Sequence, residues 1–209
     1  MFFGRAELEA RAGGNPSWNI GVNYFAQFAQ SANKQEVETL YKKAGLNLTQ
    51  DLAALNKAQR IAPDPQAVRY LKQFITFDGD LDMPVLTMHT TGDGLVVNQD
   101  EQAYKSVVDE NGDSNMLRQI FVSRAGHCAF TPAETLTAFQ TLINRLNTGR
   151  WDHSTDVTLL NQEATALGPN LNIFSVGGTI VPTPSAFVSF KPTVFLRPFN
   201  APSHDHHDH

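Results

Sequence analysis

The chain has 209 residues, 41% of them hydrophobic and 18% charged, which is typical of a globular protein with one ordinary core and excludes a disordered or fibrous chain. The net charge is -5 and the pI about 5.7, with Lys and Arg scattered singly, which argues against nucleic acid or an anionic membrane as the main partner. No apolar run reaches the roughly 18 to 20 residues that cross a bilayer, and "MFFGRAELEARAGG" lacks the long apolar region of a signal peptide.

Residues 15–79 show a helical pattern that is interrupted at intervals by helix breakers. One predicted helix ends at Ala44 because Gly45 follows it, and the last has a broad apolar face that includes Val68 and Leu71. The predicted N-terminal caps are Ser31 or Asn33, Thr49, and Asp64 followed by Pro65. We therefore expect residues 1–80 to form a helical region.

The pattern changes at residue 84, where "PVLTMHTTGD" predicts a buried parallel strand over 84–89 that ends in a Gly-Asp-Gly turn. A helix over 99–110 and a second strand over 117–123 follow. The sequence Thr-Pro-Ala-Glu at 131–134 is a capping box, and the helix after it carries one apolar face, formed by Leu136, Phe139, Leu142, Ile143 and Leu146. Alternating strands and helices predict a parallel α/β layer over residues 81–150.

After Trp151 the chain is rich in Asn, Pro, Gly and Thr, and we expect residues 151–203 to form an extended arm. The tail at 204–209 offers four possible metal ligands in a flexible segment without preformed geometry, namely His204, His206, His207 and His209. We expect adventitious metal affinity there and no cofactor, and a dedicated metal-binding role is the weakest of three functional hypotheses.

Asp93 follows the first predicted strand directly, and His127 lies in the loop "SRAGHCAFTPAE" after the second. Because functional groups gather at the carboxyl ends of parallel strands, adjacent strands would bring these two residues together. A carboxylate there can hold one imidazole nitrogen while the other takes a proton from a nucleophile. Each residue alone is also typical of an ordinary turn or loop.

These residues carry a resemblance to a known family. "PVLTMHTTGDGLVV" resembles the acid strand and turn of α/β-hydrolase fold serine hydrolases, and "GHCAFTPAE" resembles their histidine loop. The resemblance is best over 83–146, while residues 15–79 resemble a helical lid. It implies a partial α/β-hydrolase fold, Asp93 as the acid and His127 as the base of a catalytic triad, and a small ester or acyl substrate.

The family's nucleophile elbow, Gly-x-Ser-x-Gly, does not occur in the 209 residues. Ser175 in "FSVGGTI" comes after His127, which is the wrong order for the family. The chain thus resembles the C-terminal portion of a hydrolase, inactive without an N-terminal half that carries the serine. A signal on that half would make the protein secreted, so the compartment stays open. The alternative is a noncatalytic protein-binding module derived from such an enzyme.

Cys128 is the single cysteine, which excludes an internal disulfide and a multi-cysteine zinc site. As a nucleophile beside His127 it is disfavoured, because neighbours in sequence rarely direct their side chains at each other. In the tannase and feruloyl-esterase relatives of the family, a cysteine after the catalytic histidine bridges to one before the catalytic serine. That similarity implies an interchain disulfide, and a small buried thiol is the plain alternative.

Three further residues are weaker candidates for a substrate pocket. His89 lies near the end of the predicted acid strand, where we expect a structural histidine that lines the site and not a second base. Trp18 and Tyr24, with neighbouring phenylalanines, would line an acyl or aryl pocket if the helical region is a lid. Packing within that region is the favoured interpretation for both.

Overall fold

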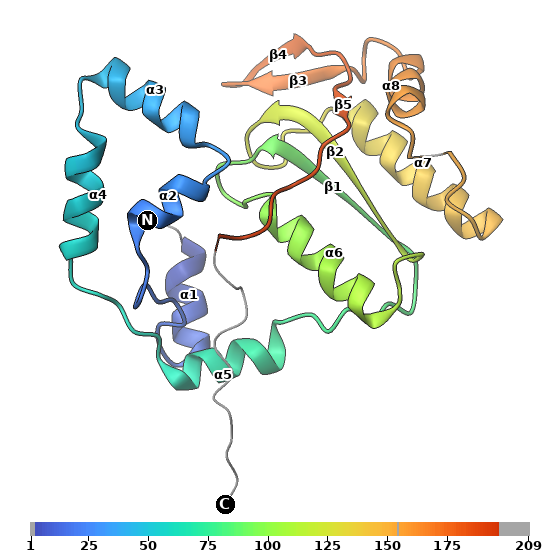
Figure 1. Ribbon diagram of the computed structural model, residues 1–209. Helices are drawn as coiled ribbons and strands as arrows, with labels where there is room; N and C mark the ends of the chain where they lie inside the picture. Colours follow the sequence, from blue (N-terminus) through green and yellow to red (C-terminus); the bar gives the residue numbers. More distant parts are fainter. Residues whose placement is uncertain (1–2, 154, 197–209) are drawn as a thin grey trace, which may run out of the picture. The chain divides into compact units, whose positions relative to one another are not determined.

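Residues 3–153 and 155–196 are described by the computed structural model, and they separate into two units (Figure 1). The first unit contains residues 3–76 together with 195–196, and it is helical. The second contains residues from 77 to 194 and holds the β-strands.

The helices of the first unit begin where side chains accept hydrogen bonds from free backbone N–H groups. Asn23 accepts from two N–H groups at the start of α2, Asn47 from one in α4, and Asp64 from one in α5. The cap of α4 is therefore Asn47 and not Thr49, which lies inside the first turn of that helix. The helices are α1 (Phe3–Ala12), α2 (Tyr24–Gln30), α3 (Lys34–Ala44), α4 (Leu48–Lys57) and α5 (Pro65–Phe74).

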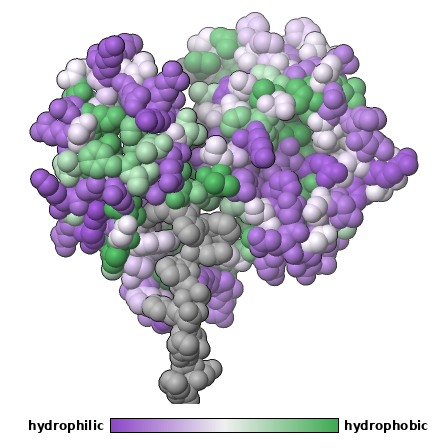
Figure 2. Space-filling model, in the orientation of Figure 1, coloured by the Kyte–Doolittle hydropathy of each residue, from purple (hydrophilic) through white to green (hydrophobic). Residues whose placement is uncertain are grey.

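Packing within the first unit is sparse. Helix α1 contacts α5, where Ala12 and Ala67 are buried, and α2 contacts α3 and α4. Helices α2, α3 and α4 are fully described, and none of their residues is buried. Apolar side chains instead gather at the surface over these helices, and the exposed ones are Phe25, Leu40 and Leu55 (Figure 2).

The second unit is organised around two parallel strands, β1 (Val85–Gly92) and β2 (Leu117–Ala125), with Val85 opposite Leu117. Between them runs α6 (Gln99–Asn111), which Gly112 ends in a left-handed conformation. A short third strand, β5 (Phe187–Val188), pairs antiparallel with β2. Both predicted strands and the helix between them are confirmed.

Helices cover both faces of this sheet (Figure 1). On one face, Ile120 and Val122 pack with Leu160 of α8 (Val157–Ala166) in the main hydrophobic cluster. On the other, the Gln119 amide donates to the Glu101 carboxylate of α6 at 2.5 Å, and the Thr87 hydroxyl donates to the same oxygen. The second unit is thus a mixed α/β structure whose small core lies between the sheet and α8.

Helix α7 (Pro132–Thr148) begins at the predicted capping box, with Thr131 and Glu134 exchanging both bonds. The apolar face that the sequence predicted for this helix is largely exposed and does not enter the core. The buried residues are Ala133, Thr137 and Thr141 with Glu134, while Leu136, Phe139, Ile143 and Leu146 are exposed. Small residues on the inner face let α7 lie close to its neighbours, and the large apolar side chains point the other way.

The expected extended arm over 151–203 is also wrong in part. Residues Val157–Ala166 form α8, capped by Asp156, and Leu160 and Ala164 on one side of it enter the core. Further along, a hairpin forms from β3 (Ile173–Val176) and β4 (Thr179–Pro182). The segment is rich in polar residues, and the two apolar residues of the helix that enter the core are only four positions apart. Its helical pattern was therefore missed in the sequence.

Candidate active site

Asp93 and His127 follow β1 and β2 at their carboxyl ends, which meet at one edge of the parallel pair. Two hydrogen bonds join the loops that carry them. The Thr90 hydroxyl donates to the Gly126 carbonyl at 2.6 Å, and the Gly126 N–H donates to the Gly92 carbonyl at 3.0 Å. The structure therefore brings together the two residues that the sequence predicted to meet.

Glycine is favoured at two points of this junction. A Cβ atom on Gly92 would lie 3.1 Å from the Cα atom of Ala125, so the two segments would have to move apart by a few tenths of an ångström. Gly126 has a φ of +108°, a backbone conformation that side chains with a Cβ atom rarely adopt. The two glycines let the chain turn sharply before His127.

The Asp93 carboxylate is held by three donors and its side chain is only 3% exposed. One oxygen, Oδ1, accepts from the N–H groups of Leu95 and Val96 at 2.8 and 2.9 Å, and Oδ2 accepts from His127 at 2.8 Å. Burial by itself raises the pKa of this carboxyl, but the hydrogen bonds from Val96, His127 and Leu95 outweigh it and lower the pKa from 3.8 to about 2. Asp93 is therefore ionised at neutral pH.

The ionised state of Asp93 fixes the tautomer of neutral His127. An ionised carboxylate can only accept, so the proton of the imidazole lies on Nδ1 and donates to Asp93. Nε2 then carries the free lone pair, on a side chain that is 43% exposed. The arrangement can accept a proton at Nε2 and stabilise the resulting imidazolium, which is the chemistry of a general base.

Cys128 lies beside that free nitrogen. Its Sγ atom is 3.5 Å from Nε2 of His127, and the residue is exposed. Its φ of +50° is uncommon for a residue other than glycine, and it turns the side chain back toward its neighbour. The expectation that neighbours in sequence would not meet is wrong here, and so is the alternative of a buried thiol.

An ion pair under the histidine loop was not predicted. Arg124 and Glu134 form two hydrogen bonds of 2.7 and 3.0 Å, and their side chains are 14% and 0% exposed. Arg124 also donates to the carbonyl of Ala129 at 2.7 Å, and Glu134 also accepts from the N–H of Ala186 at 2.9 Å. This pair links the loop after His127 to the segment before β5.

Local sequence motifs identified only one member of this pair. The capping box identified Glu134, whose carboxylate accepts from the Thr131 N–H as such boxes require. Nothing marked Arg124 as its partner, because the two residues are ten positions apart and meet only when β2 packs against the start of α7.

His89 is 9% exposed, and its Nδ1 atom lies 2.8 Å from the carbonyl oxygen of Thr90. It shares the sheet face of Thr87, which is covered by α6. On that helix, burial raises the pKa of Asp100, and the nearby His89 opposes the shift. Lining of a substrate pocket by His89 stays a prediction.

Trp18 and Tyr24 belong to the first unit. The Tyr24 hydroxyl accepts from the Asn19 amide at 3.1 Å, and the Arg60 guanidinium lies 5.3 Å from its ring centre. Their part in a substrate pocket also stays a prediction. The histidines of the tail, predicted as weak metal ligands, lie outside the described residues.

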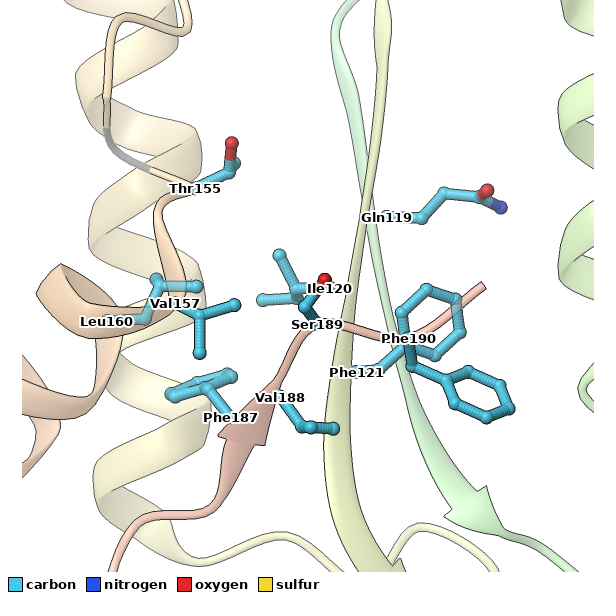
Figure 3. Close-up of a pocket in the computed structure, with 10 residues that line it drawn as sticks. All are labelled: Gln119, Ile120, Phe121, Thr155, Val157, Leu160, Phe187, Val188, Ser189 and Phe190. Carbon is cyan, nitrogen blue, oxygen red and sulfur yellow. The ribbon is translucent and has the colours of Figure 1, made fainter. Parts of the chain in front are cut away.

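A cavity of about 160 Å³ opens at the β5 side of the sheet (Figure 3). Leu160, Phe187 and Phe190 supply apolar walls, and Gln119 and Ser189 lie among the polar ones. Neither residue of the Asp93–His127 dyad lines this cavity.

The described residues offer neither a metal-ion cluster nor a membrane-spanning helix. No group of three or more His, Cys, Asp or Glu side chains in this part of the chain is arranged to hold a metal ion. No helix among them is long and apolar enough to span a membrane.

Comparison with known proteins identifies a related sequence. The chain is 34% identical over 179 residues to a protein named o-phthalyl amidase from Xanthobacter agilis. The match covers 83% of this chain and 39% of that protein, so the chain spans about two fifths of its relative's length. No family model matches the chain, and no solved structure is significantly similar to it. The amidase match supports a relationship to hydrolase-type proteins.

Proposed function

We propose that this chain supplies the acid and the base of a serine hydrolase that cleaves carboxylic ester or amide bonds, and that the serine comes from polypeptide outside the 209 residues. The observation that carries the proposal is the 2.8 Å contact between Asp93 Oδ2 and His127 Nδ1 at the carboxyl ends of adjacent parallel strands. Acid precedes histidine in the chain, as in the α/β-hydrolase fold.

The fold and the comparison support this reading. Parallel strands with helices on both faces fit the last part of an α/β-hydrolase sheet, and the first unit would then be its lid. The relative is named an amidase, which extends the expected substrates from esters to amides. Both bonds are cleaved through attack on a carbonyl carbon, so one dyad can serve either reaction.

In the proposed mechanism, the serine hydroxyl attacks the substrate carbonyl and gives its proton to Nε2 of His127. The ionised Asp93 stabilises the imidazolium that forms, through the proton that stays on Nδ1. The same Nε2 proton then passes to the departing alcohol or amine as the carbonyl–heteroatom bond breaks. Water repeats the sequence on the acyl-enzyme, releasing the acid and restoring the serine.

Complementation tests the proposal. The chain is co-expressed with the part of the Xanthobacter agilis amidase that lies outside the match, and hydrolysis of p-nitrophenyl acetate and of a phthalyl amide is measured. His127→Ala and Asp93→Asn should lower the rate by about a thousandfold or more. His153→Ala, which removes an exposed histidine of the same unit, is the matched control and should leave it unchanged.

Two results would contradict the proposal. One is a reconstituted activity that does not depend on His127 or Asp93. The other is hydrolysis by the chain alone that is lost in Cys128→Ser, because that would make Cys128 the nucleophile of a complete Cys-His-Asp set.

The position of Cys128 is also suited to a disulfide with the serine-bearing portion. Its thiol is exposed and lies 3.5 Å from the nitrogen that the serine must reach, so a bridge there would hold base and nucleophile close together. A covalent complex on a non-reducing gel that disappears in Cys128→Ser would support the bridge.

A noncatalytic protein-binding module is the second candidate. The observation that favours it is the position of β1 at the end of the strand order in the described sheet, which leaves one strand edge for a partner. This role predicts binding without hydrolysis, and a complex in which His127→Ala changes nothing would favour it over the triad.

A further inference from the structure

The outer face of α7 is apolar. Leu136, Phe139, Ile143 and Leu146 are 42%, 61%, 52% and 60% exposed. Their spacings of three, four and three residues place them in one stripe along the helix, opposite the buried Ala133, Thr137 and Thr141. A contiguous stripe of this kind, unlike scattered single residues, marks a surface that another protein surface covers.

The outer edge of strand β1 is a second surface that lacks a partner in the described sheet. In the strand order of the described sheet it has β2 on one side and no strand on the other. Its apolar residues Val85, Leu86 and Met88 are only half-buried, whereas Ile120 and Val122 of β2 are buried. Parallel strands are normally buried on both faces.

The backbone of β1 shows which groups are free to pair. The Val85 N–H donates to the Met116 carbonyl on the β2 side. Because alternate residues of a strand direct their backbone groups to opposite edges, Leu86 and Met88 direct theirs to the open edge. An added strand would pair with these two residues.

The two surfaces belong to the same side of the second unit. Helix α8 contacts β5 and α7, while α7 contacts β1. The order of the helices, α8 then α7, therefore matches the order of the strands, from β5 to β1. On one side of the unit, α7 is the last helix of its layer and β1 is the last strand of the sheet. One partner can cover both.

We propose that the α7 stripe and the open edge of β1 together form the docking surface for the serine-bearing portion of the hydrolase. That portion adds a strand beside β1 and packs an apolar helix face on Leu136, Phe139, Ile143 and Leu146. The inference rests on the proposed function and names its partner and the surface that binds it.

Two observations select this occupant. The amidase match leaves more than half of that protein without a counterpart in this chain, which is ample polypeptide for a strand and a helix. Asp93 directly follows β1, so a strand added parallel to β1 presents its own carboxyl end at the edge of the sheet where the dyad lies. A serine after such a strand is on the correct edge to reach Nε2.

The test uses the 209-residue chain and the part of the Xanthobacter agilis amidase that lies outside the match, co-expressed and purified through a tag on the latter. Ile143→Asp and Phe139→Asp should lower the recovered complex at least tenfold. Ile180→Asp is the matched control, because Ile180 lies in β4 of the same unit and is 60% exposed, and it should keep the parent level. Amide hydrogen exchange should show Leu86 and Met88 fast in the free chain and protected in the complex.

The outcomes separate this inference from the proposed function. Reconstituted, His127-dependent activity that is unaffected by Ile143→Asp and Phe139→Asp overturns the docking surface and leaves the triad standing. A complex that needs the α7 stripe and protects β1, yet has no His127-dependent activity, keeps the docking surface and overturns the triad. Absence of any complex, or a homodimer of the chain that Ile143→Asp dissociates, overturns the docking surface.

Discussion

The two units differ in what holds their helices in place. In the first, the caps are well formed, yet the fully described helices α2, α3 and α4 bury no residue. In the second, one cluster of buried side chains includes Leu160 at 1% and Val122 at 0% exposure. Local hydrogen bonds specify where the helices of the first unit begin, and side-chain packing fixes the elements of the second.

This difference assigns separate roles to local and long-range interactions. A cap can select the start of a helix, but most helix stability in proteins comes from the burial of an apolar face. The first unit lacks that burial over α2–α4, and its exposed Leu40 and Leu55 would contribute when another surface covers them. The same substitution should therefore have different effects in the two units.

The largest difference is expected for leucine replacement. Leu160→Ala should lower the free energy of unfolding of the second unit by about 2–5 kcal/mol, because it opens a cavity in the core. Leu40→Ala, at a side chain that is 56% exposed, should change that of the first by less than about 0.5 kcal/mol. Urea denaturation measures both, with Trp151 reporting on the second unit in a Trp18→Phe background and Trp18 on the first in Trp151→Phe. Equal effects would refute the comparison.

A smaller effect is expected from acid. The Asp93 carboxyl has a folded pKa of about 2 against its ordinary 3.8, so the ionised form stabilises the folded second unit above about pH 4. That contribution is lost as the pH falls from 4 toward 2. Asp93→Asn should therefore be less stable at neutral pH and show a shallower loss over this range, measured by urea midpoints with Trp151 fluorescence. If the parent and Asp93→Asn lose stability equally as the pH falls from 4 toward 2, the hydrogen-bonded, ionised state of the Asp93 carboxylate is contradicted.

The smallest effect is expected for the caps of the first unit. Asn47→Ala removes a side chain that accepts from the Gln50 N–H, and it should cost about 1 kcal/mol. Asn33 occupies the same position in α3 without a cap hydrogen bond from its side chain, so Asn33→Ala should cost much less. Far-UV circular dichroism of the two variants during thermal unfolding makes the comparison. A larger effect at Asn33 would show that packing, and not capping, determines these helix starts.

Sequence patterns predicted the site better than they predicted the packing around it. Asp93 and His127 could be paired because each follows a predicted strand, and parallel strands bring such loops together. The contact of Cys128 with Nε2 could not, since it depends on a left-handed backbone at a residue with a side chain. Arg124 could not be identified for a similar reason. Local rules identify its partner Glu134, but they do not predict the ion pair between the two residues.

The sequence by itself determined the features that depend on near neighbours: the capping box of α7, the Gly stops of α3 and α6, and the order of strands and helices in the second unit. Only the tertiary structure decided which face of α7 is buried, because periodicity shows that a stripe exists and not what covers it. It also decided that residues 157–166 form a core helix, through contacts with β5 and α7 that are distant along the chain. Local chemistry determines which faces of a helix are apolar, and long-range packing determines which face is buried.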